Sequence, residues 1–212
     1  IVNAILDWRD PDDNAREEGA EDNYYLSLFP PYHAKNGPID DLSELLLIRG
    51  ITPEIYFGPG SGTNRSARAP LTVASAKSAE DLAQNGYPVG LVDLFTPLSG
   101  RQVNLNTAPL HVLQLIPNID PNRAQQIIKY RAGPDEVDGT EDDVPFRKPG
   151  EVTSIGGLDA QMIAQVSRYV TVRSGTFRVE VDARIGTYQR QYVALLRRNN
   201  PRDIQTLYFY WK

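Results

Sequence analysis

Residues Val103–Arg131 read VNLNTAPLHVLQLIPNIDPNRAQQIIKYR, which predicts two short helices joined by a tight turn. Asn106 or Thr107 can cap the first helix, since both side chains accept hydrogen bonds from the free N–H groups at a helix start. Asp120 can cap the second helix, which begins with proline, a residue tolerated there because that N–H has no partner. Apolar residues recur at helical spacing in both segments. The stretch is therefore expected to form an αα-hairpin.

This hairpin resembles the helix-hairpin-helix motif, which in nucleic-acid-binding proteins brings backbone amides close to a phosphate. Asn118 stands where the motif usually has glycine. Only Arg123, Lys129 and Arg131 lie nearby to supply the cations on which phosphate binding depends. The whole chain has a net charge of -5, which disfavours a polyanion. We interpret the hairpin as a packing unit, with a helix-hairpin-helix DNA-binding protein as the alternative.

The composition limits the class of protein. The chain has 212 residues, of which 41% are hydrophobic, so it can form one large or two small domains with a buried core. It has no cysteine, which excludes disulfides. The chain opens without methionine in what reads as the end of an apolar helix, Ile1–Leu6. We therefore expect an upstream N-terminal part, in which a membrane segment would lie.

The C-terminal part changes to a two-residue period. From Phe177 to Ile185, apolar and polar residues alternate, which is typical of a strand with one buried and one exposed face. Short links between such segments predict an antiparallel meander. The four predicted strands are 169–173, 177–185, 188–196 and 204–211. One face of the sheet needs a cover, and the helix that ends at Leu6 is the expected one.

The order of these elements predicts an α+β fold with two domains. Residues 1–41 and 167–212 would form one domain, in which the N-terminal helix packs on the antiparallel sheet. Residues 42–166 would form a large inserted all-α domain that contains the helix-hairpin-helix-like motifs.

The first acidic loop lies within DWRDPDDNAREEGAEDNYY, residues 7–25. Carboxylates at this density repel one another unless a cation or solvent separates them, and hard oxygen ligands at D-x-D spacing suit Ca²⁺. The spacing does not match an EF-hand, and a solvated acidic loop is the alternative. The expected calcium ligands are Asp10, Asp12, Asp13, Glu21 and Asp22.

A second acidic loop, GPDEVDGTEDDVP, covers residues 133–145. Its aspartates surround a central glycine, a pattern that favours a weaker metal site over a disordered acidic turn. The candidate ligands are Asp135, Asp138, Asp142 and Asp143.

The sequence offers no catalytic constellation. His33 and His111 are far apart along the chain, and Ser154 lacks the glycine-flanked turn of a hydrolase nucleophile. Carboxylate pairs occur only in the acidic loops, where metal binding or solvation explains them better than acid–base catalysis. An enzymatic function is therefore not expected.

Three stretches in combination, DWRDPDDNAREEGAEDNYY, SELLLIRGIT and the hairpin, resemble the minor pseudopilins of type II secretion systems of the GspK type (general secretion pathway protein K). The resemblance implies a pilin-like fold, an N-terminal helix packed on an antiparallel sheet, with a large inserted helical domain. It also implies calcium in loops of the pilin part, and an upstream membrane-spanning helix cut by a prepilin peptidase.

The resemblance further implies a structural function in protein transport across the outer membrane. The chain would be the periplasmic domain of an inner-membrane-anchored protein at the tip of the pseudopilus. It would cap the filament in a heterotrimeric complex with two other minor pseudopilins. The expected partner surface is the apolar flank of the N-terminal helix, Ile1, Val2 and Ile5. A type IV pilus minor pilin with a similar insert is the related alternative.

Overall fold

The computed structural model describes residues 1–58, 89–98, 100–155 and 160–211. The chain divides into two compact units, Ile1–Pro97 and Leu98–Lys212. Residues 59–88, which fall in the predicted helical domain, lie outside the described part. No helix in the described ranges has both the length and the hydropathy needed to cross a bilayer.

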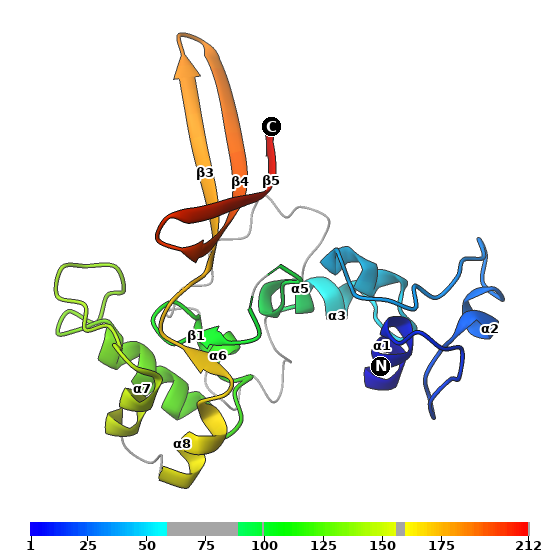
Figure 1. Ribbon diagram of the computed structural model, residues 1–212, viewed down its shortest axis with the longest axis horizontal. Helices are drawn as coiled ribbons and strands as arrows, with labels where there is room; N and C mark the ends of the chain where they lie inside the picture. The colour runs from blue at the N-terminus through cyan, green and yellow to red at the C-terminus, as the bar shows by residue number, and fades with distance from the viewer. Residues whose placement is uncertain (59–88, 99, 156–159, 212) are drawn as a thin grey trace. The chain divides into compact units, whose positions relative to one another are not determined.

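The first unit is built of short helices. Their bounds are α1 (Val2–Arg9), α2 (Asp22–Tyr25), the 3-10 helix η1 (Leu42–Leu47), α3 (Pro53–Phe57) and α5 (Leu91–Leu94) (Figure 1). Asp41 and Glu44 form a reciprocal capping box at the start of η1. Thr52 caps α3, whose first residue is a proline. Side-chain caps therefore set where η1 and α3 begin, whereas α1 and α2 have none.

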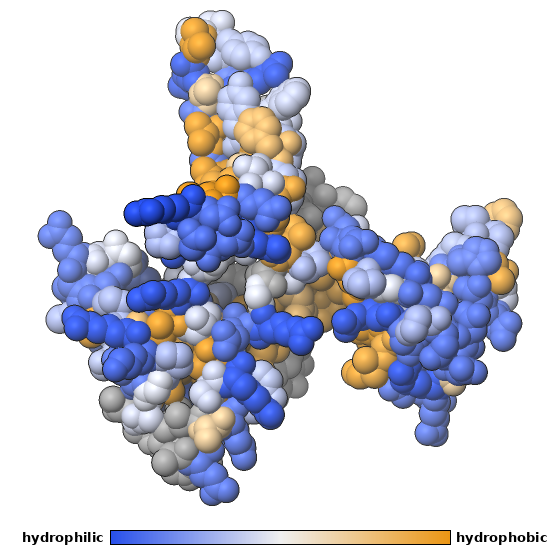
Figure 2. Space-filling model, in the orientation of Figure 1, coloured by the Kyte–Doolittle hydropathy of each residue, from blue (hydrophilic) through white to orange (hydrophobic). Residues whose placement is uncertain are grey.

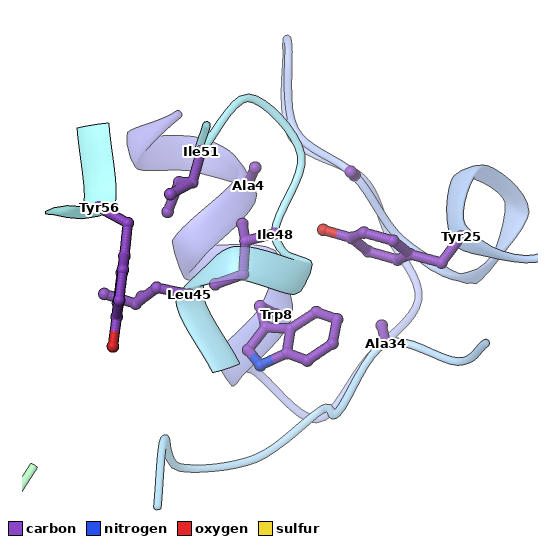
Figure 3. Packing of buried hydrophobic residues seen from close by; sticks show 9 residues of the cluster. Ala4, Trp8, Tyr25, Ala34, Leu45, Ile48, Ile51 and Tyr56 are labelled. Carbon is purple, nitrogen blue, oxygen red and sulfur yellow. The ribbon is translucent and has the colours of Figure 1, made fainter. Parts of the chain in front are cut away.

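A hydrophobic core joins the described helices of the first unit (Figure 3). Trp8, on the buried face of α1, meets the Tyr25 ring edge-on with centroids 5.2 Å apart. Leu45 and Ile48, which follow the predicted domain boundary at residue 41, belong to the same core. That boundary therefore does not separate two cores within this unit.

Helix α1 also extends further than expected, to Arg9 rather than Leu6. The helix face that stays exposed carries Val2 and Leu6. Any packing of α1 on a sheet would have to use this face, and that packing stays a prediction.

The second unit begins with the predicted hairpin. Its helical elements are α6 (Leu110–Leu113), α7 (Pro121–Arg131), the 3-10 helix η4 (Pro149–Ile155) and α8 (Ala160–Val166). Asp120 caps α7, accepting a hydrogen bond from the Arg123 backbone N–H at 2.9 Å, as predicted. Asn118 adopts a φ of +65°, the left-handed backbone that glycine usually supplies at this turn. Leu113 and Ile127 are buried, in agreement with a packing unit.

The predicted cap of the first hairpin helix is wrong. Helix α6 starts only after Pro109 and has no side-chain cap. The Asn106 amide instead donates to the carbonyls of Phe146 and Val172, at 3.0 and 3.1 Å, and accepts from the Phe146 N–H at 2.8 Å. Asn106 therefore ties together three segments that are distant in sequence.

The C-terminal sheet is antiparallel, with the order β3 (Thr176–Ile185), β4 (Tyr188–Asn200) and β5 (Asp203–Trp211). The predicted strand at residues 169–173 does not join it. That segment forms β2 (Val170–Thr171), which pairs in parallel with β1 (Val103–Asn104). The prediction failed because these two-residue strands pair residues 67 positions apart, Val103 with Val170 and Asn104 with Thr171, which no local period reveals.

The two faces of the sheet differ in exposure. Register places Val181 opposite Tyr192, and Tyr192 opposite Trp211, on one apolar face. Val181 and Trp211 are 50% and 57% exposed, and Figure 2 shows hydrophobic colour along these strands. On the other face, Val193 is fully buried. The alternation was predicted correctly, but the more apolar face is the open one.

Candidate cation site in the first acidic loop

The first acidic loop is anchored by Asp7, which lies on the buried face of α1 and is 0% exposed. Its carboxylate accepts from the Arg16 guanidinium at 2.6 Å and from the Ala20 N–H at 2.8 Å. Gly19 makes this approach possible, because a Cβ there would lie 1.9 Å from the nearer Asp7 oxygen. Arg16 also pairs with Asp10. One arginine therefore partly neutralises two carboxylates at the end of α1.

Glu21 lies in the same loop and is only 2% exposed. Neither of its carboxylate oxygens has a hydrogen-bond partner among the described residues. Burial, together with the negative charges of Asp7 and Asp10, raises the pKa of the Glu21 carboxyl to about 7. An ionised Glu21 thus needs a compensating positive charge that the surrounding side chains do not supply.

Two further buried oxygens lack a partner in the described part of the chain, Asp10 Oδ1 and Asn36 Oδ1. Asn36 holds the acidic loop through its Nδ2, which donates to Asp13 at 3.0 Å. Together, the loop and Asn36 therefore carry carboxylate oxygens of Asp10 and Glu21 and one amide oxygen without a hydrogen-bond partner among the described residues.

The predicted ligands separate into two groups. Asp10, Asp12 and Asp13 are, with Asp7, the charges that act on Glu21. Asp22 points elsewhere: it bonds to His33 Nδ1 at 2.6 Å and accepts from the Ala34 N–H at 2.7 Å.

Sequence reasoning missed three residues of this cluster, Asp7, Arg16 and Asn36. Arg16 was detectable, because it is one of only two basic residues within an acidic stretch. Asn36 was not, because it reaches Asp13 from 23 residues away.

These donors match a calcium ion in kind, since Ca²⁺ takes six to eight hard oxygen ligands from carboxylates and amide carbonyls. The unpaired oxygens of Glu21, Asp10 and Asn36 are the observation that supports the match. Within the described ranges, no three acidic or histidine side chains already converge as a complete ligand set. Binding would therefore require the loop side chains to rearrange around the ion.

The second acidic loop uses its aspartates differently. Asp138 is paired with Arg131, and Asp142 accepts from Thr140 Oγ1 at 2.7 Å and from the Asp135 N–H at 3.1 Å. Asp143 accepts from the Gly139 N–H at 2.9 Å. Most of these carboxylate oxygens are bonded within the protein, but Asp143 Oδ1 is buried and has no hydrogen-bond partner among the described residues, so a metal in this loop stays a prediction.

The basic residues of the hairpin are also engaged internally. The Arg123 guanidinium donates to the Asn118 carbonyl at 2.8 Å, and Lys129 pairs with Glu136 at 2.5 Å. Arg131 is 5% exposed. The hairpin therefore does not present these three cations together to a phosphate backbone.

Two parts of the chain match known protein families. Residues 1–57 match the family model for type II secretion system protein K, and residues 99–171 match that for the helix-hairpin-helix motif. Protein K of Pseudomonas aeruginosa (PAO1) is 27% identical over 209 residues, which cover 98% of this chain and 49% of that protein. Protein K of Klebsiella pneumoniae is 40% identical over 56 residues, or 26% of this chain and 17% of that protein.

The fold is similar to a chain in the crystal structure of the GspK–GspI–GspJ complex from enterotoxigenic Escherichia coli. The TM-score is 0.56 at 16% identity, covering 99% of this chain and 61% of the other. The chain spans about half the length of protein K of Pseudomonas aeruginosa, and its match to protein K of Klebsiella pneumoniae covers 17% of that protein. The chain is therefore similar to protein K of type II secretion systems, in sequence over 98% of its length and in fold over 99%.

Proposed function

We propose that this chain is the periplasmic part of a minor pseudopilin at the tip of the type II secretion pseudopilus. Its role there is structural: it caps the filament together with other minor pseudopilins and so supports protein secretion across the outer membrane. The observation that carries the proposal is the similarity to protein K over 98% of the chain. The similar solved structure is a complex that contains GspI and GspJ as well as GspK, which supports minor pseudopilins as partners.

The proposed architecture is a pilin-like body with an inserted helical part. The open apolar face of β3–β5 supports it, because a sheet face of this kind is stable only when a helix or another sheet covers it. The core shared by the described residues of the first unit favours one revision. Residues 1–41 would belong with the helices that follow them, since Trp8 and Leu45 share that core.

The partner surface is proposed on α1. Val2 is 70% exposed and Leu6 is 41% exposed, so both are available to another protein. Ile1 is 49% exposed, whereas Ile5 packs against the core of its own unit and is less available than the sequence suggested. A membrane helix upstream of this surface would anchor the protein in the inner membrane.

Calcium is proposed at the first acidic loop, where Glu21, Asp10, Asp13 and Asn36 would hold it. When bound, the ion would supply the positive charge that the buried Glu21 carboxylate lacks. Asp7 and Arg16 would then keep the loop fixed to α1 through their hydrogen bonds. Because the ion would bind only the folded loop, it would stabilise the first unit by mass action.

A secretion assay in a strain that lacks the corresponding gene tests the proposed function. The intact gene should restore export of the secreted proteins, and a gene with Val2→Asp and Leu6→Asp should not. Leu26→Ser is the matched control, because Leu26 is 47% exposed in the same unit but lies outside α1. Full export without the gene would overturn the proposal. Binding of duplex DNA at low salt would instead favour the helix-hairpin-helix alternative.

A further inference from the structure

The second acidic loop closes on itself at the end of α7. The Arg131 carbonyl accepts from the Val144 N–H at 2.8 Å, which joins the two ends of the loop. Gly133 has a φ of +70°, and a Cβ at this position would lie 2.2 Å from the Asp142 carbonyl oxygen. The loop thus begins and ends beside the last turn of α7, and Asp138 bonds to Arg131 in that turn.

Arg131 is the centre of this arrangement. It is 5% exposed, and its Nε and Nη2 donate to the two oxygens of Asp138 at 2.9 and 2.6 Å. Its Nη1 donates to the carbonyl oxygens of Leu105 and Ala108, both at 2.8 Å. One buried guanidinium therefore connects the acidic loop with the segment between β1 and α6.

The acceptors around Arg131 are the kind that a calcium ion takes: a bidentate carboxylate and two main-chain carbonyls. A guanidinium satisfies the same acceptors with directed N–H donors in a planar fork, and it cannot be deprotonated or chelated away. We propose that Arg131 takes the place of a metal ion in the second acidic loop. The loop is consequently ordered without calcium. Of its carboxylates, Asp138 has both oxygens bonded to Arg131, whereas in the first loop both oxygens of buried Glu21 lack a partner among the described residues; Asp143 keeps one buried oxygen without a partner, Oδ1.

Limited proteolysis of the whole chain with a glutamate-specific protease tests whether Arg131 takes the place of a metal ion. Glu136 and Glu141 lie in the loop and are exposed, so fragments that end at these residues report on loop opening. Arg131→Gln and Asp138→Asn should each increase cleavage there by about tenfold, the effect of losing a charged hydrogen bond. Arg131→Lys should give an intermediate rate, because lysine keeps the charge but not the fork. Lys129→Gln, which removes an exposed ion pair with Glu136, should leave the rate nearly unchanged.

The metal question is decided by repeating the digestion in EDTA and in millimolar calcium. Cleavage at the two loop sites should be equal in both conditions, in the wild type and in a Glu21→Gln background. Faster cleavage in EDTA that calcium reverses in the Glu21→Gln background would overturn the proposal. Should Arg131→Gln fail to fold, Asp138→Asn decides the point, because Asp138 is 40% exposed and tolerates an amide. An unchanged rate in Asp138→Asn would also overturn it.

Discussion

Replacing Glu21 with glutamine should reverse the stability order of wild type and variant when calcium is added. In the calcium-free protein above pH 7, Glu21 is ionised although it is buried beside Asp7 and Asp10. Its pKa is raised from 4.5 to about 7, which corresponds to a destabilisation of about 3 kcal/mol once the carboxyl is ionised. Glutamine at position 21 removes the destabilisation caused by the buried charge, but it leaves an unpaired amide that costs roughly 1–2 kcal/mol. The variant should therefore be the more stable form in EDTA at pH 8.

The sign of the pH dependence follows from the same shift. A carboxyl with a raised folded-state pKa binds more protons in the folded than in the unfolded chain between pH 4.5 and 7. The free energy of unfolding of the calcium-free wild type should thus fall as the pH rises through this window. Glu21→Gln should lack this part of the fall.

With calcium the order should invert, because the ion stabilises only the protein that retains the carboxylate. Calcium at a hundred times its dissociation constant adds about 2.7 kcal/mol to the wild type. Urea unfolding followed by Trp8 fluorescence measures the effect of the substitution in EDTA and the stabilisation by calcium. Trp8 reports on unfolding because it is 3% exposed in the core of this unit. Trp211→Phe in both proteins removes the second tryptophan signal. The reasoning would be refuted if the wild type were more stable than Glu21→Gln in EDTA at pH 8 and if calcium did not change its free energy of unfolding.

Three further substitutions test contacts that fix the two units, each by denaturant unfolding. Gly19→Ala should destabilise the first unit by roughly 1–3 kcal/mol, because its Cβ would collide with the Asp7 carboxylate; unchanged stability would mean that the loop moves freely. Asn106→Ala should cost the second unit about 2–3 kcal/mol, since it breaks three hydrogen bonds that link separate segments, and a loss below about 0.5 kcal/mol would contradict this role. Asp120→Ala should cost about 1 kcal/mol through the lost α7 cap, and Asp120→Asn should restore most of it.

Local patterns were sufficient for the elements whose signals lie within a few residues. The Asp120 cap and the proline that follows it define the start of α7, and the alternation from Phe177 to Ile185 defines β3. Asn106 has the same capping chemistry as Asp120, yet its amide is used by Phe146, 40 residues further on. Which of two equivalent side chains becomes a cap therefore depends on tertiary contacts that the sequence does not display.

The candidate site shows the same limit at the level of side-chain direction. Glu21 and Asp22 are adjacent, so both entered the predicted ligand set. Glu21 is the N-cap of α2, with an extended backbone, and Asp22 is the first helical residue. Asp22 bonds to His33 and to the Ala34 N–H instead, so adjacency in sequence did not place the two carboxylates in one cluster. Arg131, by contrast, lies four residues after buried Ile127 on the same helix face, and this pattern could have revealed a buried arginine.

The central claim, that this chain functions as a minor pseudopilin within a tip complex, is tested most directly by its mass in solution with partners. The chain is mixed with the periplasmic domains of the GspI- and GspJ-type pseudopilins from the same secretion system, and light scattering follows size-exclusion chromatography. The account predicts one complex that contains a copy of each protein, which Val2→Asp with Leu6→Asp weakens and Leu26→Ser does not. Elution of the unaltered chain as a monomer at concentrations where the other two proteins associate would contradict it.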